Sequence, residues 1–420
     1  MAILKNKILY VLNEDNEYVP FYTVDNELFL TADSVENLFL WEDYKRAVRY
    51  PLSKRVVRLY YLNDDETINQ DISECITSGN LSFKYGQGIT RTADITLNNF
   101  SKKMYPNPIK SIIWQGRKFR IDVGLCYNKT IFWKKCGIFA AQTPSINESD
   151  FTTSIQLYDK FAMVDGTIGG KRDHEFKIPV GTKIHTAIQM CLNEDKGNGR
   201  PYDYKFVNFP MKYEDVVTPY TITKSNNCSM GDIILELAKM ISCDVFYDDN
   251  GHLTLTTDSD SFGNEYRGIW WDYNENELLY TPPSISYNSS NAYNKITVCG
   301  AIQNGYQFKG VYENTNPKSQ YNTNISEVRA QRIDDDNITS DILCFERAKY
   351  EYQKNSRNVM ELKCDSIFIP CLLPNNVVTW SNKRLGIVNE KFIINSIDMD
   401  LMNNALMGVG MTSLNEVAIC

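Results

Sequence analysis

The stretch SGNLSFKYGQGITRTADITLNN, residues 78–99, has the pattern of two antiparallel strands joined by a short turn. In its second half, residues such as Ile95 and Leu97 place apolar side chains on one parity, and threonine and aspartate fill the other. A period of two predicts strands that are buried on one face only. We therefore expect adjacent strands over residues 78–85 and 89–98, with Gly-Gln-Gly as their turn.

Arg91 lies on the apolar parity of the second strand and interrupts it. A guanidinium group on a buried face needs hydrogen-bond acceptors, because burying an unpaired charge is unfavourable. We expect the Arg91 side chain to reach a partner carboxylate, either within its own subunit or across an interface between subunits.

Strand patterns of the same kind recur before and after this stretch. Short strands separated by turn residues at such a spacing suggest a closed or nearly closed β-barrel or a sandwich. The Asn403-Asn404 pair predicts a hairpin turn between the last two strands. The other predicted strands cover residues 55–62, 118–125, 131–141, 150–159, 292–302, 358–366, 375–381, 390–401 and 405–414.

The middle of the chain has helical patterns instead. Residues 181–195 predict a helix with Thr182 as its N-cap, and residues 229–242 predict a second helix capped by Ser229. The Asn250-Gly251 pair then predicts a β-hairpin with a type I′ turn, so this part is α+β. The residues expected to face its core are Ile184, Ala187, Ile188, Cys191, Leu192, Ile234, Leu237, Ala238 and Ile241.

A further helix is expected over residues 340–355, in the C-terminal β-rich part. The first 50 residues are expected to form an extension, with short strands over 8–12 and 27–32 and a helix over 34–48. The apolar positions of the C-terminal helix are Ile342, Phe345, Ala348 and Tyr352, and the N-terminal helix has Ser34 as its cap and Leu38, Trp41 and Val48 among its apolar positions.

The charge balance argues against nucleic-acid recognition. The chain has 44 basic and 52 acidic residues and a formal net charge of −8, so the usual electrostatic attraction to phosphates is missing. A mildly acidic surface instead suits a wall past which DNA slides without sticking.

Cysteine usage and hydropathy limit the structural class further. The 11 cysteines include no Cys-x-x-Cys pair, and several, including Cys191, Cys299 and Cys364, sit within apolar patterns. They are expected to be buried free thiols in a reducing compartment rather than disulfides or zinc ligands. No run of 18 apolar residues occurs, so no membrane-spanning helix is expected, and the N-terminus lacks the small-residue cleavage site of a signal peptide.

No motif for catalysis, cofactor binding or metal binding stands out. The three histidines, His174, His185 and His252, have no metal-ligand spacing. The acidic stretch beginning at Asp258 lacks a calcium-loop pattern, because Phe262 and Ile269 occupy positions where ligands are required. Nucleophile-elbow and phosphate-loop motifs do not occur. We therefore expect no enzyme, no cofactor and no metal site.

A series of stretches, in sequence order, carries a family resemblance. They are RVVRLYYLNDDETINQDISECITSGNLSFKYGQGITRTADITL, WQGRKFRIDVGL, FWKKCGIFAAQTPSINESDFTTSIQLYDKFAMVDGTIGG, IPVGTKIHTAIQMCL, SMGDIILELAKMISCDVFYDDNGHLTL, AYNKITVCGA and NNVVTWS. This series resembles the baseplate hub or tail hub family of long-tailed phages and phage-derived contractile particles, and particularly the hub of Gram-positive phages. The resemblance covers roughly residues 54–415 and leaves the first 50 without a counterpart.

The resemblance implies a mainly β fold with an α+β part, in which two tail-tube-like β-barrel domains flank a small α+β domain. The implied units are an N-terminal extension at 1–53, a first barrel at 54–165, an α+β insert at 166–262, and a second barrel with one helix at 263–420.

The same resemblance implies a structural role at the tail tip of a virion assembled in the bacterial cytoplasm. The chain would form a homotrimeric ring that joins the hexameric tail tube to a trimeric spike or lysin and lines the channel. Its other partners would be the tape-measure protein and neighbouring baseplate proteins, and DNA would pass without specific binding.

Two other function classes stay open at this point. A tail-associated cell-wall hydrolase would need a catalytic domain, and none is expected after the second β part. A carbohydrate-binding tail-tip protein would use aromatic faces such as those of Trp270 and Trp271, although such residues more often pack in cores and interfaces.

Overall fold

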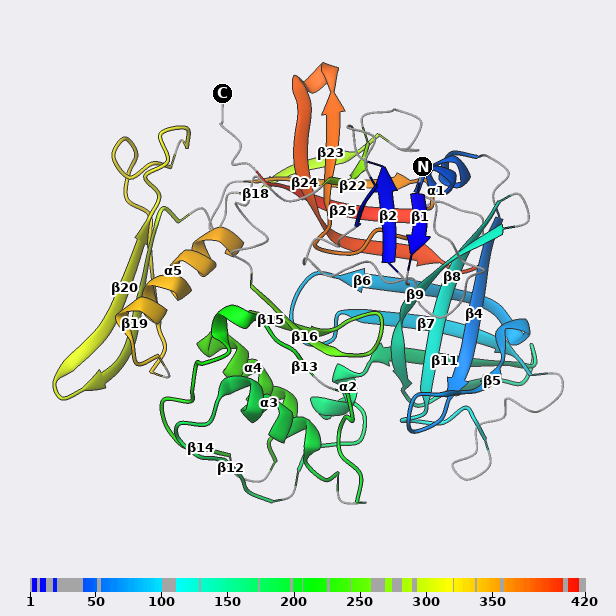
Figure 1. Cartoon of the computed structure of the whole chain (residues 1–420), viewed down its shortest axis with the longest axis horizontal. Helices are drawn as coiled ribbons and strands as arrows, with labels where there is room; N and C mark the ends of the chain where they lie inside the picture. Colours follow the sequence, from blue (N-terminus) through cyan, green and yellow to red (C-terminus); the bar gives the residue numbers. More distant parts are fainter. Residues whose placement is uncertain are drawn as a thin grey trace.

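The computed structural model confirms a mainly β fold with an α+β part (Figure 1). The N-terminal strands β1 (Ala2–Lys5), β2 (Ile8–Leu12) and β3 (Tyr18–Pro20) form a separate antiparallel sheet. The residues described are 2–5, 8–12, 18–20, 41–50, 54–99, 111–127, 130–172, 174–196, 199–205, 207–224, 227–241, 243–257, 269–273, 282–288, 293–319, 321–336, 338–355, 359–402 and 407–414.

The stretch at residues 78–99 forms the predicted antiparallel hairpin. Strand β6 (Ile76–Lys84) pairs with β7 (Arg91–Asn98), in a register that sets Leu81 opposite Ala93. The Lys84 N–H donates to the Thr90 carbonyl at 2.8 Å and closes the loop between the strands. Side chains of β7 alternate between buried and more exposed positions along the strand, as the period of two requires.

This hairpin lies in the middle of one 14-stranded sheet. Strand β24 (Ile387–Asp400) pairs antiparallel with β6, setting Asp398 opposite Ser82, and so joins the two predicted β parts edge to edge. The order is β18-β22-β25-β24-β6-β7-β11-β9-β8-β4-β5, with β10, β17 and β23 off this path. Among the described strands this path is open, so pairing does not divide it into two separate closed barrels.

The remaining strands of this sheet come from the segments before and after the α+β part. They are β4 (Lys54–Leu62), β5 (Ile68–Asp71), β8 (Lys118–Tyr127), β9 (Thr130–Ala141), β10 (Ser145–Asn147), β11 (Thr152–Asp159), β17 (Ile269–Asp272), β18 (Ser284–Asn288), β22 (Val359–Ser366), β23 (Val377–Asn382) and β25 (Met407–Ser413).

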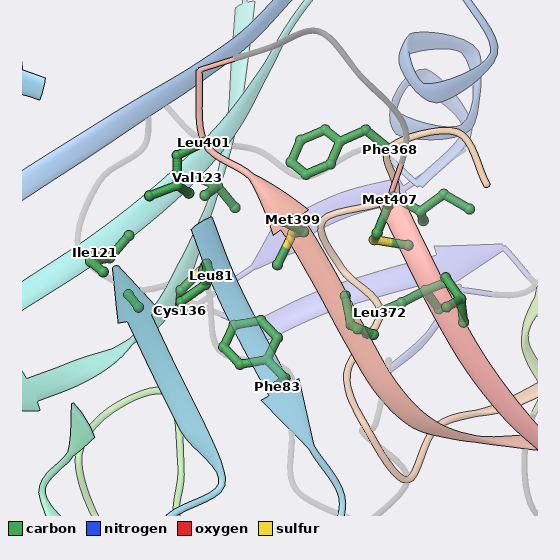
Figure 2. Packing of buried hydrophobic residues seen from close by; sticks show 14 of the residues in the cluster. Leu81, Phe83, Ile121, Val123, Cys136, Phe368, Leu372, Met399, Leu401 and Met407 are labelled. Carbon is green, nitrogen blue, oxygen red and sulfur yellow. The ribbon is translucent and has the colours of Figure 1, made fainter. Parts of the chain in front are cut away.

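Both β parts contribute to one hydrophobic core. Leu81 and Phe83 of β6 belong to the same buried cluster as Met399 and Leu401 of the C-terminal part (Figure 2). Helix α1 (Trp41–Arg49) also packs on this core through Tyr44, which is 1% exposed. The Tyr44 hydroxyl accepts a hydrogen bond from the Cys371 N–H at 3.0 Å, so the helix is bound to the C-terminal part as well.

The α+β part has its own core, built on helices α3 (Ile184–Asn193) and α4 (Met230–Met240). The nine residues predicted to face it are all buried. Ser229 caps α4 as predicted, in a capping box with Asp232. Thr182 was predicted wrongly, because Lys183 occupies the N-cap of α3 and the Thr182 hydroxyl donates instead to the Pro179 carbonyl.

The predicted hairpin in this part forms between β15 (Cys243–Tyr247) and β16 (Leu253–Thr257), but its turn differs from the predicted type. A type I′ turn needs positive φ at both central residues; Gly251 has φ 76° and Asn250 does not. The Asp248 carboxylate instead accepts from the N–H groups of Asn250 and His252 and holds a longer loop. The other elements are α2 (Phe161–Val164), β12 (Phe176–Ile178), β13 (Val207–Asn208) and β14 (Ile222–Lys224).

A third, small core joins helix α5 (Asp341–Asn355) to β19 (Lys295–Gln303), β20 (Tyr306–Glu313) and β21 (Ala330–Asp334). Ala348 and Tyr352 are buried there as predicted, whereas Ile342 and Phe345 are 72% and 45% exposed. The three-stranded sheet covers only a narrow stripe of the helix. A Cβ at Gly310 would lie 2.1 Å from the Phe345 nitrogen, so close contact between helix and strand requires this glycine.

Several predicted features lie outside the described residues: Ser34, Leu38, the strand at 27–32, the acidic stretch at 258–263 and the Asn403-Asn404 turn. Within the part of the chain that is described, no helix is long and apolar enough to cross a membrane.

Candidate functional site

One face of the large sheet is lined with small polar side chains. We call this surface the polar sheet face and define it by the outward residues of β6, β7, β11 and the end of β24. Thr96 and Ser154 contact each other across β7 and β11, with 3.3 Å between their hydroxyl oxygens, and Ser82 hydrogen-bonds to Asp398 across β6 and β24. Its members are Ser78, Asn80, Ser82, Lys84, Thr92, Asp94, Thr96, Ser154, Gln156, Ser396, Asp398 and Asp400.

A shallow groove of about 590 Å³ runs over part of the polar sheet face. Its lining consists of hydroxyl, amide and carboxylate groups together with Ile95 and Ile155. Asp94 and Asp400 lie on either side of Asn80 in the strand register. These groups can hydrate the surface or hydrogen-bond to a partner, but the lining contains no histidine, cysteine or lysine to act as a base or nucleophile.

Arg91 lies in the interior of the β7–β9 region and is 7% exposed. Its Nη1 donates to the Cys136 carbonyl at 2.7 Å, and its guanidinium lies over the Phe83 ring at 5.3 Å. Its own backbone N–H donates to the Asp159 carboxylate at 3.0 Å. A contact of Arg91 with a second subunit stays a prediction.

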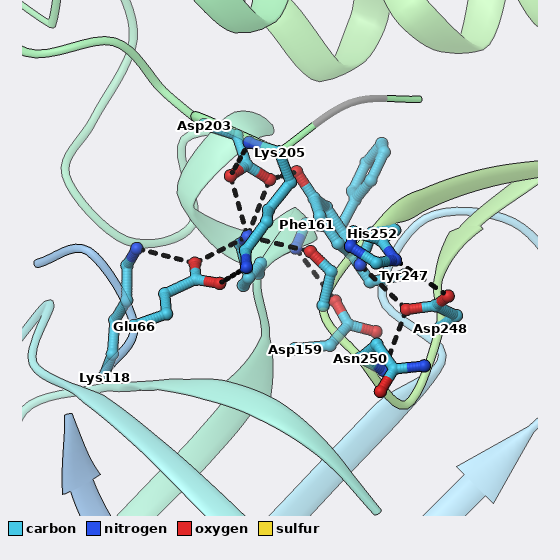
Figure 3. Close-up of polar contacts among 12 residues, drawn as sticks. Glu66, Lys118, Asp159, Phe161, Asp203, Lys205, Tyr247, Asp248, Asn250 and His252 are labelled. Atoms are coloured by element: carbon cyan, nitrogen blue, oxygen red, sulfur yellow. Dashed lines mark hydrogen bonds and ion pairs between the residues drawn. The ribbon is translucent and has the colours of Figure 1, made fainter. Parts of the chain in front are cut away.

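A buried ionic cluster joins the first β part to the α+β part (Figure 3). The Lys160 ammonium, 1% exposed, lies 2.8 Å from Asp203 Oδ1 and 2.7 Å from Glu66 Oε1. It also donates to the Gly251 carbonyl at 2.9 Å, and Tyr247 donates to Asp203 at 2.9 Å. Burial opposes ionisation of Glu66, but Lys160 and Lys118 hold its pKa below the ordinary value.

Asp159, next in the chain, fixes the start of the same connection. Its carboxylate accepts hydrogen bonds from the N–H groups of Thr90, Arg91 and Phe161, at 2.7, 3.0 and 3.0 Å. Burial raises the pKa of Asp159 to about 6, although these donors oppose the shift. The side chain therefore ties the β6–β7 loop to the segment that leads into the α+β part.

A second buried carboxylate joins three parts of the molecule. Asp244 of β15 is fully buried and accepts from Tyr85 Oη at 2.8 Å and from Gln87 Nε2 at 2.6 Å, both in the β6–β7 loop. Tyr350 of α5 donates to the same carboxylate at 3.0 Å. The Gly88 N–H adds a backbone bond to Val245 at 2.9 Å. The β6–β7 loop is therefore linked through Asp244 to both β15 and α5.

The Lys134–Asp249 ion pair makes stability dependent on pH. Burial alone would raise the pKa of Asp249, but the positive charges of Lys134 and Arg91 lower it to about 2. The folded state therefore binds fewer protons than the unfolded state between roughly pH 2 and 4, so stability falls as the pH falls through this window.

Asp249→Asn is expected to lower the free energy of unfolding near neutral pH by about 2 kcal/mol and to flatten its decline in acid. Urea unfolding of wild type and variant at several pH values down to about 3 measures both effects. If wild type and variant differ in unfolding free energy by the same amount at every pH in that range, the lowered pKa of Asp249 is contradicted.

The other candidate residues from the sequence do not come together. His174 lies beside Glu194, His185 is on α3, and His252 follows the β15–β16 turn. Among the described side chains, no group of three histidine, cysteine or acidic residues is arranged to hold a metal ion. Cys191, Cys299 and Cys364 are buried as predicted.

The aromatic pair proposed for sugar stacking packs inward. Trp271 is 4% exposed, and its ring meets Tyr44 edge-on at 6.4 Å, while Trp270 packs against the same core. This arrangement favours the packing interpretation over a sugar-binding surface.

Neither the ionic cluster around Lys160 nor the hydrogen-bonded cluster around Asp244 was predicted from the sequence. Glu66, Lys160 and Asp203 are far apart in the chain, so no spacing relates them. One signal was present, because Asp159 and Lys160 place two charges at the end of a strand that alternates polar and apolar residues, where burial without partners would be costly.

Comparisons with known proteins agree with a tail-protein fold. A family described as a domain of unknown function (DUF5048) matches residues 318–417, and no curated protein sequence matches the chain. The 43 kDa tail protein of prophage MuSo2 from Shewanella oneidensis is similar in structure, with a TM-score of 0.56 and 14% identity, over 86% of this chain and 98% of that one.

Two further solved structures match over a similar share. A tail protein from Neisseria meningitidis has a TM-score of 0.56 and 8% identity, covering 86% of this chain and 96% of its own. The prophage tail protein gp18 from Listeria monocytogenes has a TM-score of 0.52 and 13% identity, covering 86% and 95%. Identities this low relate the folds alone, and the chain has the fold of these tail proteins.

Proposed function

We propose that the chain is the structural hub of a phage tail tip, or of the baseplate of a phage-tail-like particle. It acts as a ring-forming adaptor between the hexameric tail tube and a trimeric spike or lysin, with tape-measure and baseplate proteins as further neighbours. The tail-protein fold, which spans 86% of the chain, supports this role. The proposed role is not enzymatic, and the protein's place is the virion.

The observation that carries the proposal is the polar sheet face. It continues across β24 and β6, the strands that join the two β parts, and so gives an uninterrupted wall of small polar side chains. Of its charged members, Asp94, Asp398 and Asp400 are acidic and Lys84, at the end of β6, is basic. Such a surface stays hydrated and repels phosphates, as a channel wall needs when DNA passes without specific binding.

In the proposed assembly three copies form the ring, and each supplies two tube-like units, so that six units match the six-fold tube above. The units are residues 54–165 and 263–420, the insert at 166–262 lies outside the wall, and residues 1–53 contact a neighbouring baseplate protein. The separate core of the α+β part, which includes Val164 and Leu255, supports a boundary near each end of the insert.

The proposal is tested by the mass and shape of the purified chain. Light scattering after size-exclusion chromatography is expected to give three times the chain mass at high concentration, and electron microscopy is expected to show rings with an open centre. A single-chain mass at every concentration would overturn the ring. A zymogram with cell-wall clearing would overturn the non-enzymatic role.

A further inference from the structure

A long β-hairpin projects from the body of the molecule. Strands β23 and β24 extend beyond the other elements of the large sheet (Figure 1). The base is anchored, because Trp380 is 3% exposed and its ring packs edge-on against Phe392 at 6.0 Å. We call residues 381–390 the hairpin arm. Within the arm, Ile387 packs against the common core, whereas Lys383, Arg384, Leu385 and Val388 are exposed.

The tip of the hairpin arm combines exposed apolar and basic side chains. Leu385 and Val388 are 51% and 76% exposed, and Lys383 and Arg384 beside them are exposed as well. Two large aliphatic groups presented together at the end of a projecting element are typical of a binding surface rather than a solvated turn.

The arm is held in shape by its own hydrogen bonds. The Asn382 side chain accepts from the N–H groups of Arg384 and Leu385 at 3.0 and 3.3 Å. Lower down, the Asn389 N–H donates to the Ser381 hydroxyl at 2.7 Å. A tip that is already ordered loses less conformational entropy when it binds.

A surface of complementary chemistry occurs on the opposite end of the large sheet. Strand β5 is exposed along its whole length, and β4 is its only strand partner among the described residues. Ile68 on this strand is 49% exposed. We call this surface the acidic edge; besides Ile68 it comprises the exposed residues Asp64, Asp65, Asp71 and Glu74.

The acidic edge remains accessible despite its local contacts. Asp64 pairs with Arg200, but both side chains stay more than half exposed. Asp65 and Asp71 accept hydrogen bonds from Thr67 and Ser73, and both stay exposed. The patch therefore presents an apolar side chain within a negative field, which matches the apolar and positive tip of the arm.

We propose that the hairpin arm of one copy of this chain docks on the acidic edge of a second copy. The arm belongs to β24, and six strands separate β24 from β5 on the strand path, so we assign the contact to two copies rather than to one chain. A contact between two different surfaces is head-to-tail and closes into a ring when the rotation allows. This inference rests on the proposed ring and names its contact.

Opposite charges favour pairing of the hairpin arm with the acidic edge. With a net charge of −8, copies of the chain repel one another on average, and self-association needs a local positive patch that meets a negative one. An exposed strand edge, such as that of β5 among the described strands, is also a surface that proteins generally cover.

The test is charge reversal with rescue in the full chain, measured by light scattering and analytical ultracentrifugation. Lys383→Glu with Arg384→Glu is expected to weaken association at least tenfold. Asp64→Lys with Glu74→Lys is expected to weaken it similarly, and the chain with all four changes is expected to recover assembly. Asp65 and Asp71 are left intact because they hold their own turns.

A matched control separates the contact from net charge. Lys171→Glu with Lys177→Glu changes the net charge equally at exposed positions of the α+β part and is expected to assemble as the wild type does. Normal assembly of the arm variant, or loss without recovery in the four-fold variant, overturns the docking while the ring stands. A wild type that never exceeds one chain overturns both. If the arm variant forms normal rings that fail to join tails, the arm binds another tail protein, and the docking is also overturned.

Discussion

Lys160→Met is expected to lower the free energy of unfolding by about 3–5 kcal/mol. Lys160 is 1% exposed and neutralises two carboxylates, those of Asp203 and Glu66. Removing the ammonium would take the counterion from the buried Asp203 and leave Glu66 with Lys118 at 2.8 Å, and methionine cannot donate to the Gly251 carbonyl. Urea unfolding followed by tryptophan fluorescence measures the loss.

Lys205→Met is the matched control for this prediction. Its ammonium lies 3.7 Å from Glu66 and the side chain is 35% exposed, so its replacement is expected to change stability by less than about 1 kcal/mol. If the two variants lose similar amounts of unfolding free energy, burial of the lysine does not determine how much it contributes to stability.

Asp244→Asn is expected to destabilise the protein by about 3 kcal/mol, since hydrogen bonds to a buried charged group contribute more than neutral ones. The amide would remove the charge and point a donor toward groups that also donate, namely Tyr85, Gln87 and Tyr350. Hydrogen exchange is expected to rise in the β6–β7 loop, in β15 and in α5 together, because one carboxylate binds all three.

Tyr350→Phe provides the comparison, because it removes one donor and leaves the bonds from Tyr85 and Gln87 in place. Its expected effect is about 1 kcal/mol, with faster exchange in α5 alone. Equal exchange changes in both variants would mean that Asp244 does not link the loop to α5.

Local patterns in the sequence predicted local structure well. The period of two at residues 78–99 identified the β6–β7 hairpin, and the Ser229 capping box identified the start of α4. These features depend on residues within a few positions of one another, so their physics is contained in the sequence pattern.

Features set by distant segments could not be read in the same way. The pattern of α5 shows an apolar stripe but not the width of the sheet beneath it, so Ile342 and Phe345 were expected to be buried and are exposed. In the same way, the residues next to Lys160 or Asp244 in the sequence do not indicate which distant side chains will contact them. The single sheet through both β parts was missed for this reason too, because β6 and β24 carry ordinary strand patterns.

The pairing of β6 with β24 also has a consequence for biosynthesis. Ser82 and Asp398 face each other across 316 positions of chain, so the edge of β6 must wait until β24 has left the ribosome. Structures dominated by such remote pairings fold slowly and expose open strands meanwhile. A truncated product that ends before β24 would keep this edge unsatisfied and would therefore be prone to aggregate, so that incomplete chains are excluded before particles assemble.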